Sequence, residues 1–133
     1  PIICYESIYS DYVTEYVRKG ANLLFIITND GWWQDTPGYK QHFAFARIRA
    51  IENRRSIARS ANTGISGFID QKGDVISKTE WWKPDAISAT INANNSETLF
   101  TKFPYLIGVI AVISTFILLL LTTVQLWRKK SAK

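Results

Sequence analysis

The sequence predicts an α/β domain over residues 1–102, followed by one transmembrane helix over residues 103–127. Two observations support this prediction. Residues 1–28 contain an apolar run, a segment with helical spacing and a second apolar run, which is typical of two parallel strands joined by a helix. Residues 103–127 carry no charged side chain and exceed the roughly 20 apolar residues that cross a bilayer core.

The strand–helix–strand unit is predicted in three parts. Residues 1–4 and 22–28 are short apolar runs whose β-branched residues favour buried strands. Between them, apolar residues recur at spacings of three and four from Tyr5 to Lys19, which predicts a helix, and Gly20 is typical of a helix end. Parallel strands joined in this way usually form a sheet that is covered on both faces.

The rest of the domain is expected to hold one more helix and several short strands. Turn-forming residues predict a loop over residues 29–38, and helical spacing predicts a helix from Tyr39 to Arg55. Short strands separated by turns are expected near Ser56–Ala61, Ile65–Asp70, Val75–Thr79 and Ala86–Asn92. Residues 97–102 then lead into the apolar run.

The long apolar run is predicted to span a membrane rather than to fill the core of a small domain. Tyr105 and Trp127 lie near its ends, where aromatic side chains favour the membrane–water boundary. The basic tail over residues 128–133 predicts a cytoplasmic C-terminus. Residues 1–102 are then expected on the periplasmic side of a bacterial inner membrane.

The positive net charge does not predict binding to nucleic acid. The formal net charge is +5, but four of the 16 basic residues follow the apolar run, which leaves 12 basic against 11 acidic residues in the rest of the chain. The excess therefore belongs to the tail beside the membrane, and a nucleic-acid partner is not expected.

Cys4 is the first candidate for chemistry because it lies where a predicted strand ends and a helix begins. Ligand crevices of open α/β sheets lie beyond the carboxyl ends of the strands. The start of a helix also favours a thiolate, and the Tyr5 backbone N–H is placed to help hold an oxyanion. The alternative is a buried structural cysteine. As the chain has one cysteine, no intrachain disulfide is possible.

Glu6 and His42 are further candidates, each with a structural alternative. Glu6 follows Cys4 by two residues and either orients a group in the pocket or acts as a favourable charge at the helix start. His42 is the only histidine, so a Cys–His pair must be considered beside a structural role on its helix. One cysteine and one histidine cannot form a zinc site unaided, and no glycine-rich phosphate loop is present, so no metal or cofactor is expected.

Trp32 and Trp33 lie on the loop after the second strand, on the same sheet edge as Cys4. They either plug the domain or contact lipid or an acyl chain, because tryptophan is favoured at membrane surfaces. Trp81 and Trp82 form a similar pair on a later turn, without a predicted link to Cys4.

Several motifs together resemble the nitrilase superfamily. The motifs are Ile3–Glu6, Gly20–Leu24, Arg49–Asn53 and Ala61–Asn62. The loop Thr28–Trp33, followed by Gln41–His42 and a final apolar helix, is similar to the membrane-bound apolipoprotein N-acyltransferases of that superfamily. The resemblance covers essentially the whole chain and implies part of an αββα sandwich followed by one C-terminal transmembrane helix.

The resemblance also implies roles for individual residues. Nitrilases use a Glu–Lys–Cys triad, in which Cys4 matches the nucleophile and Glu6 matches a further glutamate that the acyltransferases need nearby. The implied substrate-binding residues are Tyr5, Asn29, Asp30, Trp32, Trp33 and His42. The triad Glu and Lys normally precede the Cys, so we expect the chain to be a C-terminal piece that is inactive alone.

The implied reaction is N-acylation of lipoproteins. An acyl chain would pass from a phospholipid to Cys4 as a thioester, and then to the N-terminal α-amine of a diacylglyceryl-cysteine apolipoprotein. The partners would be the phospholipid donor, the apolipoprotein acceptor and the membrane. Two alternatives remain at this stage: a membrane-anchored amidase or nitrilase that passes the acyl group to water, and a catalytically silent anchored binding module.

Overall fold

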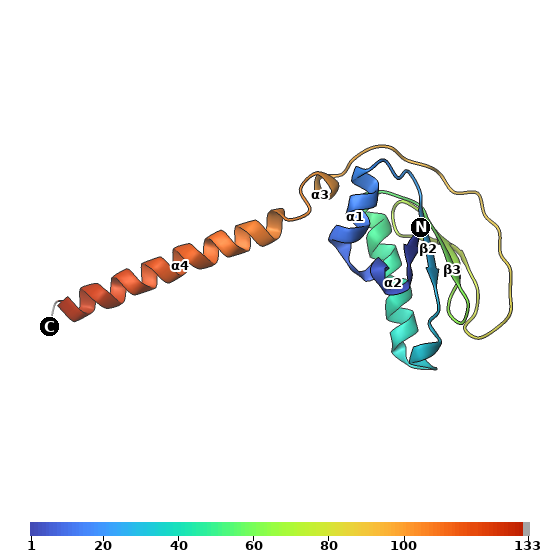
Figure 1. Ribbon diagram of the computed structural model, residues 1–133, viewed down its shortest axis with the longest axis horizontal. Helices are drawn as coiled ribbons and strands as arrows, with labels where there is room; N and C mark the ends of the chain where they lie inside the picture. The colour runs from blue at the N-terminus through green and yellow to red at the C-terminus, as the bar shows by residue number, and fades with distance from the viewer. Residues whose placement is uncertain (132–133) are drawn as a thin grey trace. The chain divides into compact units, whose positions relative to one another are not determined.

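The computed structural model describes residues 1–131, and it divides the chain into two units, Pro1–Lys102 and Phe103–Lys133. Residues 132–133, the last two of the predicted basic tail, lie outside the described residues. The first unit is a mixed α/β domain, and the described part of the second consists mainly of one long helix (Figure 1).

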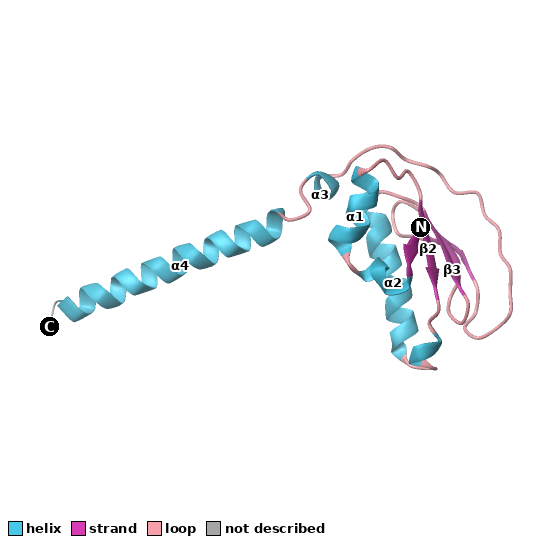
Figure 2. Ribbon diagram, viewed as in Figure 1, coloured by secondary structure: helices cyan, strands magenta, loops and turns pink. Residues whose placement is uncertain are grey.

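The first unit contains one five-stranded sheet in the order β1-β2-β3-β4-β5 (Figure 2). The strands are β1 (Ile2–Ile3), β2 (Leu24–Thr28), β3 (Ile57–Ala61), β4 (Gly67–Ile69) and β5 (Val75–Lys78). The first three run parallel, whereas β4 and β5 each run antiparallel to the strand before. The predicted α/β fold class is confirmed.

Two helices, α1 (Ser10–Arg18) and α2 (Pro37–Asn53), connect the parallel strands and lie on the same side of the sheet (Figure 1). Thr36 caps α2 and Pro37 begins it, which suits a helix start because proline lacks the N–H that would be unpaired there. The helix ends before the predicted Arg55 because Arg54 adopts a left-handed conformation, with φ 50°.

The helix predicted from Tyr5 to Lys19 is divided. A 3₁₀ helix, η1 (Cys4–Ile8), precedes α1, and Tyr9 between them is extended, with φ −83° and ψ 106°. The tighter turn is stabilised by bonds over three residues, from the Tyr9 N–H to the Glu6 carbonyl and from the Ser7 hydroxyl to the Cys4 carbonyl. A second 3₁₀ helix, η2 (Gly31–Trp33), lies in the predicted loop.

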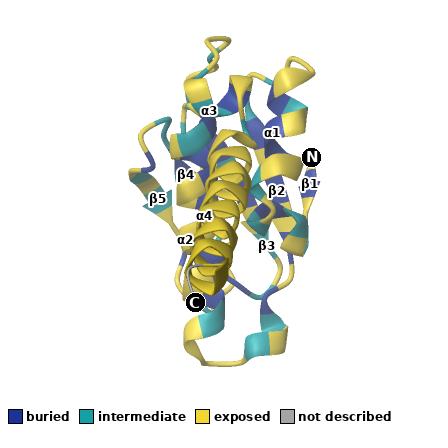
Figure 3. Ribbon diagram, turned by 90° about the vertical axis from the view of Figure 1, so that its left-hand side faces the viewer, coloured by how far each residue is buried: buried dark blue, intermediate teal, exposed yellow. Residues whose placement is uncertain are grey.

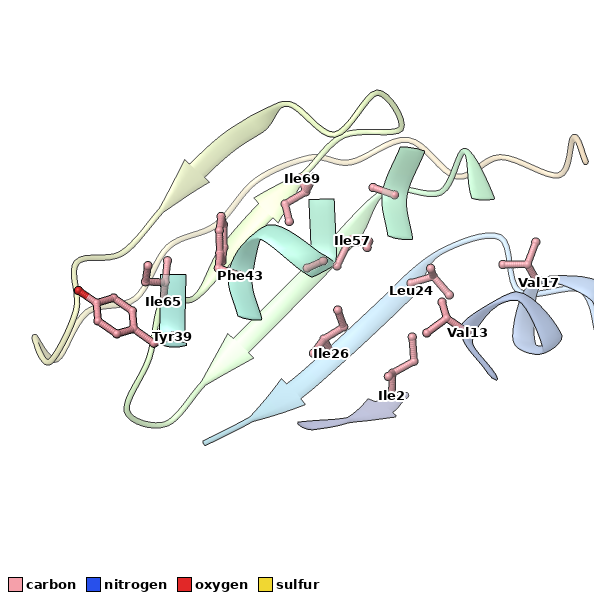
Figure 4. Packing of buried hydrophobic residues seen from close by; sticks show 12 residues of the cluster. Ile2, Val13, Val17, Leu24, Ile26, Tyr39, Phe43, Ile57, Ile65 and Ile69 are labelled. Carbon is pink, nitrogen blue, oxygen red and sulfur yellow. The ribbon is translucent and has the colours of Figure 1, made fainter. Parts of the chain in front are cut away.

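The hydrophobic core lies between the helices and one face of the sheet (Figure 4). Its members include Ile2, Val13, Val17, Leu24, Ile26, Phe43, Ala46, Ala50, Ile57 and Ile69. Each fully buried Val, Leu or Ile side chain contributes about 1.5–3 kcal/mol relative to an exposed one. This packing holds the carboxyl ends of β1, β2 and β3 side by side.

Within the first unit, Pro1–Lys102, the opposite face of the sheet carries no helix (Figure 1). Residues in β2 alternate strictly, so Leu24 and Ile26 are buried while Phe25 and Ile27 are about half exposed. Ile3 of β1 is also half exposed. The first unit therefore forms one helical layer and one sheet, and the predicted covering of both faces by helices is not seen within it.

The strand predicted at Ala86–Asn92 is absent from the described structure. Ile87, Ala89 and Ile91 are partly buried while their neighbours are exposed, so the side chains keep the period of a strand. The backbone does not pair with the sheet. Instead, the Asn92 carbonyl accepts hydrogen bonds from the side chains of Ser56 and Gln71. The prediction of an extended chain over these residues is confirmed, whereas the prediction that they form a strand of the sheet is wrong.

The described part of the second unit contains α4 (Leu106–Ser131), a helix of 26 residues that is long and apolar enough to cross a membrane. At 1.5 Å per residue it spans about 39 Å, more than the roughly 30 Å of a bilayer core. Its described residues are exposed throughout (Figure 3). Arg128, Lys129 and Lys130 lie in its last turn, where positive charge is favoured. A short helix, α3 (Leu99–Lys102), ends the first unit.

Candidate functional site

Cys4 lies at the junction of β1 and η1, and its backbone is strained. Its φ of 50° belongs to the left-handed region, which costs a residue with a side chain about 1–3 kcal/mol. The side chain is partly buried. Strain of this kind persists where the surrounding structure enforces it. In this conformation the Cys4 sulfur lies at the carboxyl end of the neighbouring strand β2.

Thr28, the last residue of β2, contacts the Cys4 sulfur. Its Oγ1 lies 3.3 Å from Cys4 Sγ and 2.9 Å from Asp30 Oδ1. Thr28 is buried, because its side chain lies on the core side of the alternating strand. Sequence reasoning missed Thr28 as a site residue, although its position one strand away from Cys4 and at the same sheet edge was predicted.

Asp30 is at the centre of a buried polar network of four residues, Thr28, Asp30, His42 and Arg59, called here the Asp30 network. His42 Nδ1 lies 2.9 Å from Asp30 Oδ1, and Arg59 Nη2 lies 2.7 Å from Asp30 Oδ2. Asp30, His42 and Arg59 are 0%, 2% and 3% exposed. They come from the loop after β2, from α2 and from β3. The network therefore links these three parts of the fold by hydrogen bonds next to Cys4.

The signal for Arg59 was present in the sequence but was not used. Ile57 of β3 is a core residue, as is Ile69, its partner on β4. Arg59 follows Ile57 by two residues in the same strand, so its side chain lies on the same buried face of the sheet. A charged residue at such a position needs a buried partner. Arg59 has Asp30 as its partner and also donates to the Ile65 carbonyl.

His42 is linked to the backbone of Cys4 rather than to its sulfur. His42 Nε2 lies 2.9 Å from Ser7 Oγ, and Ser7 Oγ donates to the Cys4 carbonyl at 2.8 Å. Within the described residues, the side chain that bonds the Cys4 sulfur is Thr28. The structure therefore brings Cys4 and His42 together through Ser7, and it does not form the direct Cys–His pair considered from the sequence.

The pKa of Asp30 is lowered although the carboxyl is buried. Burial by itself raises the pKa, but hydrogen bonds from His42 and Arg59, together with the positive charge of Arg59, outweigh that effect. Asp30 is therefore an ionised carboxylate that only accepts hydrogen bonds. It follows that His42 Nδ1 carries the hydrogen in their contact.

This lowered pKa predicts a loss of stability in acid. The folded state holds Asp30 ionised below the ordinary aspartate pKa of about 3.9, so its stabilising contribution is complete above that pH. The contribution is lost as the pH falls through the lower pKa of the folded state. We expect the free energy of unfolding, measured by urea titration at several pH values, to decline below about pH 4.

Asp30→Asn removes the titrating group. We expect this variant to be less stable at neutral pH, and its free energy of unfolding to fall less steeply in acid. Asp85→Asn, which changes an exposed carboxylate, should keep the acid decline of the unmodified protein. An unchanged decline in Asp30→Asn would contradict the assignment.

Glu6 closes the start of η1 and also lies beside the site. Its Oε2 accepts from the Ile3 backbone N–H at 2.7 Å, and its Oε1 accepts from the Tyr12 hydroxyl at 3.3 Å. Hydrogen bonding to Tyr16, with a smaller effect of Glu6, raises the pKa of Tyr12 to about 12. The helix-start role considered for Glu6 is present in the structure, and its carboxylate remains two residues from the candidate nucleophile.

An aromatic wall, formed by Tyr5 and Trp33, packs against His42 next to Cys4. The ring centres of Tyr5 and Trp33 are 6.2 Å apart, and those of Trp33 and His42 are 5.2 Å apart. Gly38 allows this arrangement, because a Cβ there would lie 2.4 Å from Trp33 Cδ1. Trp32 is 81% exposed. The structure thus separates the two tryptophans, one into the wall and one into solvent.

Asn29 connects this region to the turn after β3. Its Oδ1 accepts hydrogen bonds from the Gly31 N–H and from the Thr63 hydroxyl. Beside that turn lies an open pocket of about 450 Å³, lined by residues that include Asn62, Thr63, Gly64, Trp82 and Lys83. Trp81 stacks on Tyr39 with ring centres 3.9 Å apart, so the second tryptophan pair borders the same end of the sheet.

The described residues contain no cluster of three or more histidine, cysteine, aspartate or glutamate side chains that could hold a metal ion. The site consists instead of a strained cysteine, a hydroxyl at its sulfur, a nearby carboxylate and exposed aromatic rings. Such a set suits nucleophilic attack by a thiolate on an acyl group whose remainder is apolar.

Comparisons with known proteins are consistent with this chemistry. The carbon-nitrogen hydrolase family matches residues 1–99. Among curated proteins, the chain is 43% identical over 106 residues to the apolipoprotein N-acyltransferase of Chlorobaculum tepidum, an alignment that covers 80% of this chain and 20% of that protein. It is 34% identical over 119 residues to the apolipoprotein N-acyltransferase of Thermotoga maritima, with 86% and 24% of the two chains covered.

The fold comparison identifies a solved structure with a similar fold. A carbon-nitrogen hydrolase from Helicobacter pylori G27 superposes with a TM-score of 0.53 at 15% identity, over 62% of this chain and 36% of that one. The chain spans between a fifth and a quarter of the length of the curated relatives from Chlorobaculum tepidum and Thermotoga maritima. At this identity, the structural match shows the fold alone.

Proposed function

Because the chain belongs to the carbon-nitrogen hydrolase family, we propose that it carries the nucleophile of a membrane-bound N-acyltransferase that acts on lipoproteins. The observation that supports the proposal most directly is the strained Cys4 at the end of β1, with its sulfur at the Thr28 hydroxyl. The curated relatives bear the name apolipoprotein N-acyltransferase, and they point to the lipoprotein acceptor.

The proposed reaction has two steps. The Cys4 thiolate attacks the ester carbonyl carbon of a phospholipid acyl chain, a C–S bond forms, and the C–O bond to glycerol breaks. The lysophospholipid leaves as an alcohol after taking up a proton. The α-amine of a diacylglyceryl-cysteine then attacks the thioester, a C–N bond forms, the C–S bond breaks, and the amine loses a proton as the thiolate returns. A thioester suits this sequence because it divides one difficult step into two easier ones.

Other residues are assigned supporting roles in this proposal. Glu6 is the nearby carboxylate, while the Tyr5 ring, 50% exposed, and Trp33 form an apolar wall for the acyl chain. Trp32 contacts lipid from its exposed position, and Asn29 fixes the loop that carries both tryptophans. In this scheme the general-base Glu and the oxyanion Lys are assigned to parts of the full-length protein outside residues 1–133.

The remaining substrate-site candidates, Asp30 and His42, are assigned a different position. Both side chains are buried and face protein groups, so they support the site from behind rather than from the substrate side. We also propose that α4 crosses the bacterial inner membrane with its basic end in the cytoplasm, which leaves the domain that carries Cys4 on the periplasmic side.

The thioester is the step to test. The full-length membrane protein that carries these residues is incubated with phospholipid vesicles, and the peptide that contains Cys4 is analysed by mass spectrometry. We expect an acyl mass on Cys4 that hydroxylamine removes. Residues 1–133 alone, which lack the proposed base and lysine, should show no adduct and serve as the control.

A folded full-length protein that forms no adduct with accessible lipid would contradict the proposal. Rapid hydrolysis of small amides by the same protein would then favour an amidase, the activity class of the wider family. If neither reaction occurs, a silent binding module remains.

A further inference from the structure

On the basis of the proposed role of Cys4, we infer that Thr28 is a positioning residue for the nucleophile. Its hydroxyl hydrogen turns from Asp30 to the Cys4 sulfur when the thiol ionises. Thr28 thereby stabilises the thiolate without touching the substrate.

The geometry allows two hydrogen-bonding states. Thr28 Oγ1 is within reach of both Asp30 Oδ1, at 2.9 Å, and Cys4 Sγ, at 3.3 Å. A hydroxyl has one hydrogen and two lone pairs. While Cys4 is a thiol, its S–H donates to Thr28 and Thr28 donates to Asp30. Once Cys4 is a thiolate, its sulfur only accepts, and the Thr28 hydrogen turns toward it.

Asp30 can release the Thr28 hydrogen because it keeps two other donors. His42 Nδ1 remains at 2.9 Å from Oδ1 and Arg59 Nη2 at 2.7 Å from Oδ2. Each carboxylate oxygen therefore retains a partner, and the buried charge is not left unpaired. A buried carboxylate without such support would hold the Thr28 hydroxyl and oppose the second state.

Thr28 is also held in place by its position in the sheet. β2 lies between β1 and β3, and Thr28 is its last residue, paired in register with Ala61. The side chain is 5% exposed, and β-branching restricts its rotation about χ1. The hydroxyl can turn its hydrogen without moving its oxygen, so the change of partner needs no rearrangement of the protein.

The charged and titratable groups around Cys4 come from four parts of the fold. Glu6 lies on η1, Asp30 follows β2, His42 lies on α2 and Arg59 lies on β3. A substitution at Thr28 changes none of these charges. A change in the reactivity of the sulfur would therefore report the hydroxyl rather than a change in the local field.

Thr28→Val tests the inference because valine keeps the shape and loses the hydroxyl. The full-length membrane protein is treated with iodoacetamide over a range of pH, and alkylation of the Cys4 peptide is followed by mass spectrometry. The thiolate is the reactive form. Loss of a hydrogen bond to a charged acceptor should slow alkylation at neutral pH by about tenfold and move the midpoint of the rate profile to higher pH.

Two variants control for structural effects. Thr28→Ser restores the hydroxyl and should recover most of the alkylation rate. Thr14→Val removes a hydroxyl of α1 that is also buried and that donates to Asn53 Oδ1, on α2, at 3.1 Å. It should alkylate like the unmodified protein. If Thr28→Val does not fold, judged by its thermal unfolding, Thr28→Ala replaces it with a side chain that cannot overpack.

The outcomes separate this inference from the proposed function. An unchanged rate profile in Thr28→Val overturns the positioning role, as does equal slowing in Thr14→Val. Alkylation needs no acyl donor, so it reads the Thr28 effect even if the unmodified protein forms no acyl adduct. Absence of an acyl adduct in the unmodified protein would refute only the acyltransferase proposal. Slow alkylation in Thr28→Val, with recovery in Thr28→Ser, supports the inference.

Discussion

Cys4→Ala in the full-length protein is expected to lower the rate of acyl transfer by at least about a thousandfold, because removal of a nucleophile leaves only binding and charge stabilisation. Transfer is measured with labelled phospholipid and a diacylglyceryl-cysteine peptide. The fold should survive the change. Alanine keeps the Cβ that already occupies the left-handed backbone at this position, and Cys4 is only partly buried.

Cys4→Ser gives the sharper comparison. Serine nearly matches the size of cysteine and keeps a hydrogen-bond donor toward Thr28, but at neutral pH its hydroxyl is a far weaker nucleophile than a thiol unless a base activates it. We expect it to be nearly as inactive as the alanine variant while it unfolds at a similar temperature. Full activity in Cys4→Ser would refute the thioester mechanism.

Arg59→Met is expected to produce the largest loss of stability, about 3–5 kcal/mol, because it leaves a buried carboxylate without its main counter-charge. Arg59 and Asp30 are almost completely buried and their atoms lie 2.7 Å apart. The free energy of unfolding is measured by urea titration in detergent, followed by tryptophan fluorescence. Methionine fills much of the arginine volume, so the loss reports the charge pair more than a cavity.

Arg18→Met is the matched control. Arg18 is exposed and lies 3.7 Å from Glu15 on the same helix, so its loss should cost less than about 1 kcal/mol. Similar costs for the two variants would mean that the Arg59–Asp30 pair does not stabilise the fold. A large cost for Arg59→Met alone would show that the buried Arg59–Asp30 pair stabilises the fold.

The parts of the fold that depend on local patterns were predicted well. Strand β2 was predicted from a continuous apolar run, and α2 and α4 were predicted from spacing and length to within a few residues. Errors arose where backbone pairing or capping decided the structure. The side-chain pattern of Ala86–Asn92 fits extended chain, but nothing local reveals whether a neighbouring strand is free to pair with it.

The site was predicted only in part, for a related reason. Cys4, Glu6 and the tryptophan loop could be found because they follow strand ends in order along the chain. The links from Thr28 to Cys4 and from Arg59 to Asp30 join residues 24 and 29 positions apart. Such contacts depend on strand order and register, which the sequence pattern alone did not specify. Asp30 and His42 were chosen as substrate-binding candidates, and neither their burial nor the hydrogen bond between them was predicted, because both depend on the packing of α2.

The hydrogen bond from the Ile3 N–H to Glu6 has a consequence for self-association. β1 is the outermost strand of the described sheet, and an outer strand normally offers free backbone groups on which another chain can add as a further strand. The Glu6 carboxylate occupies one of these donors at 2.7 Å and places a negative charge beside it. Within the described residues, this edge of the sheet therefore has one fewer free backbone donor on which a further strand could add.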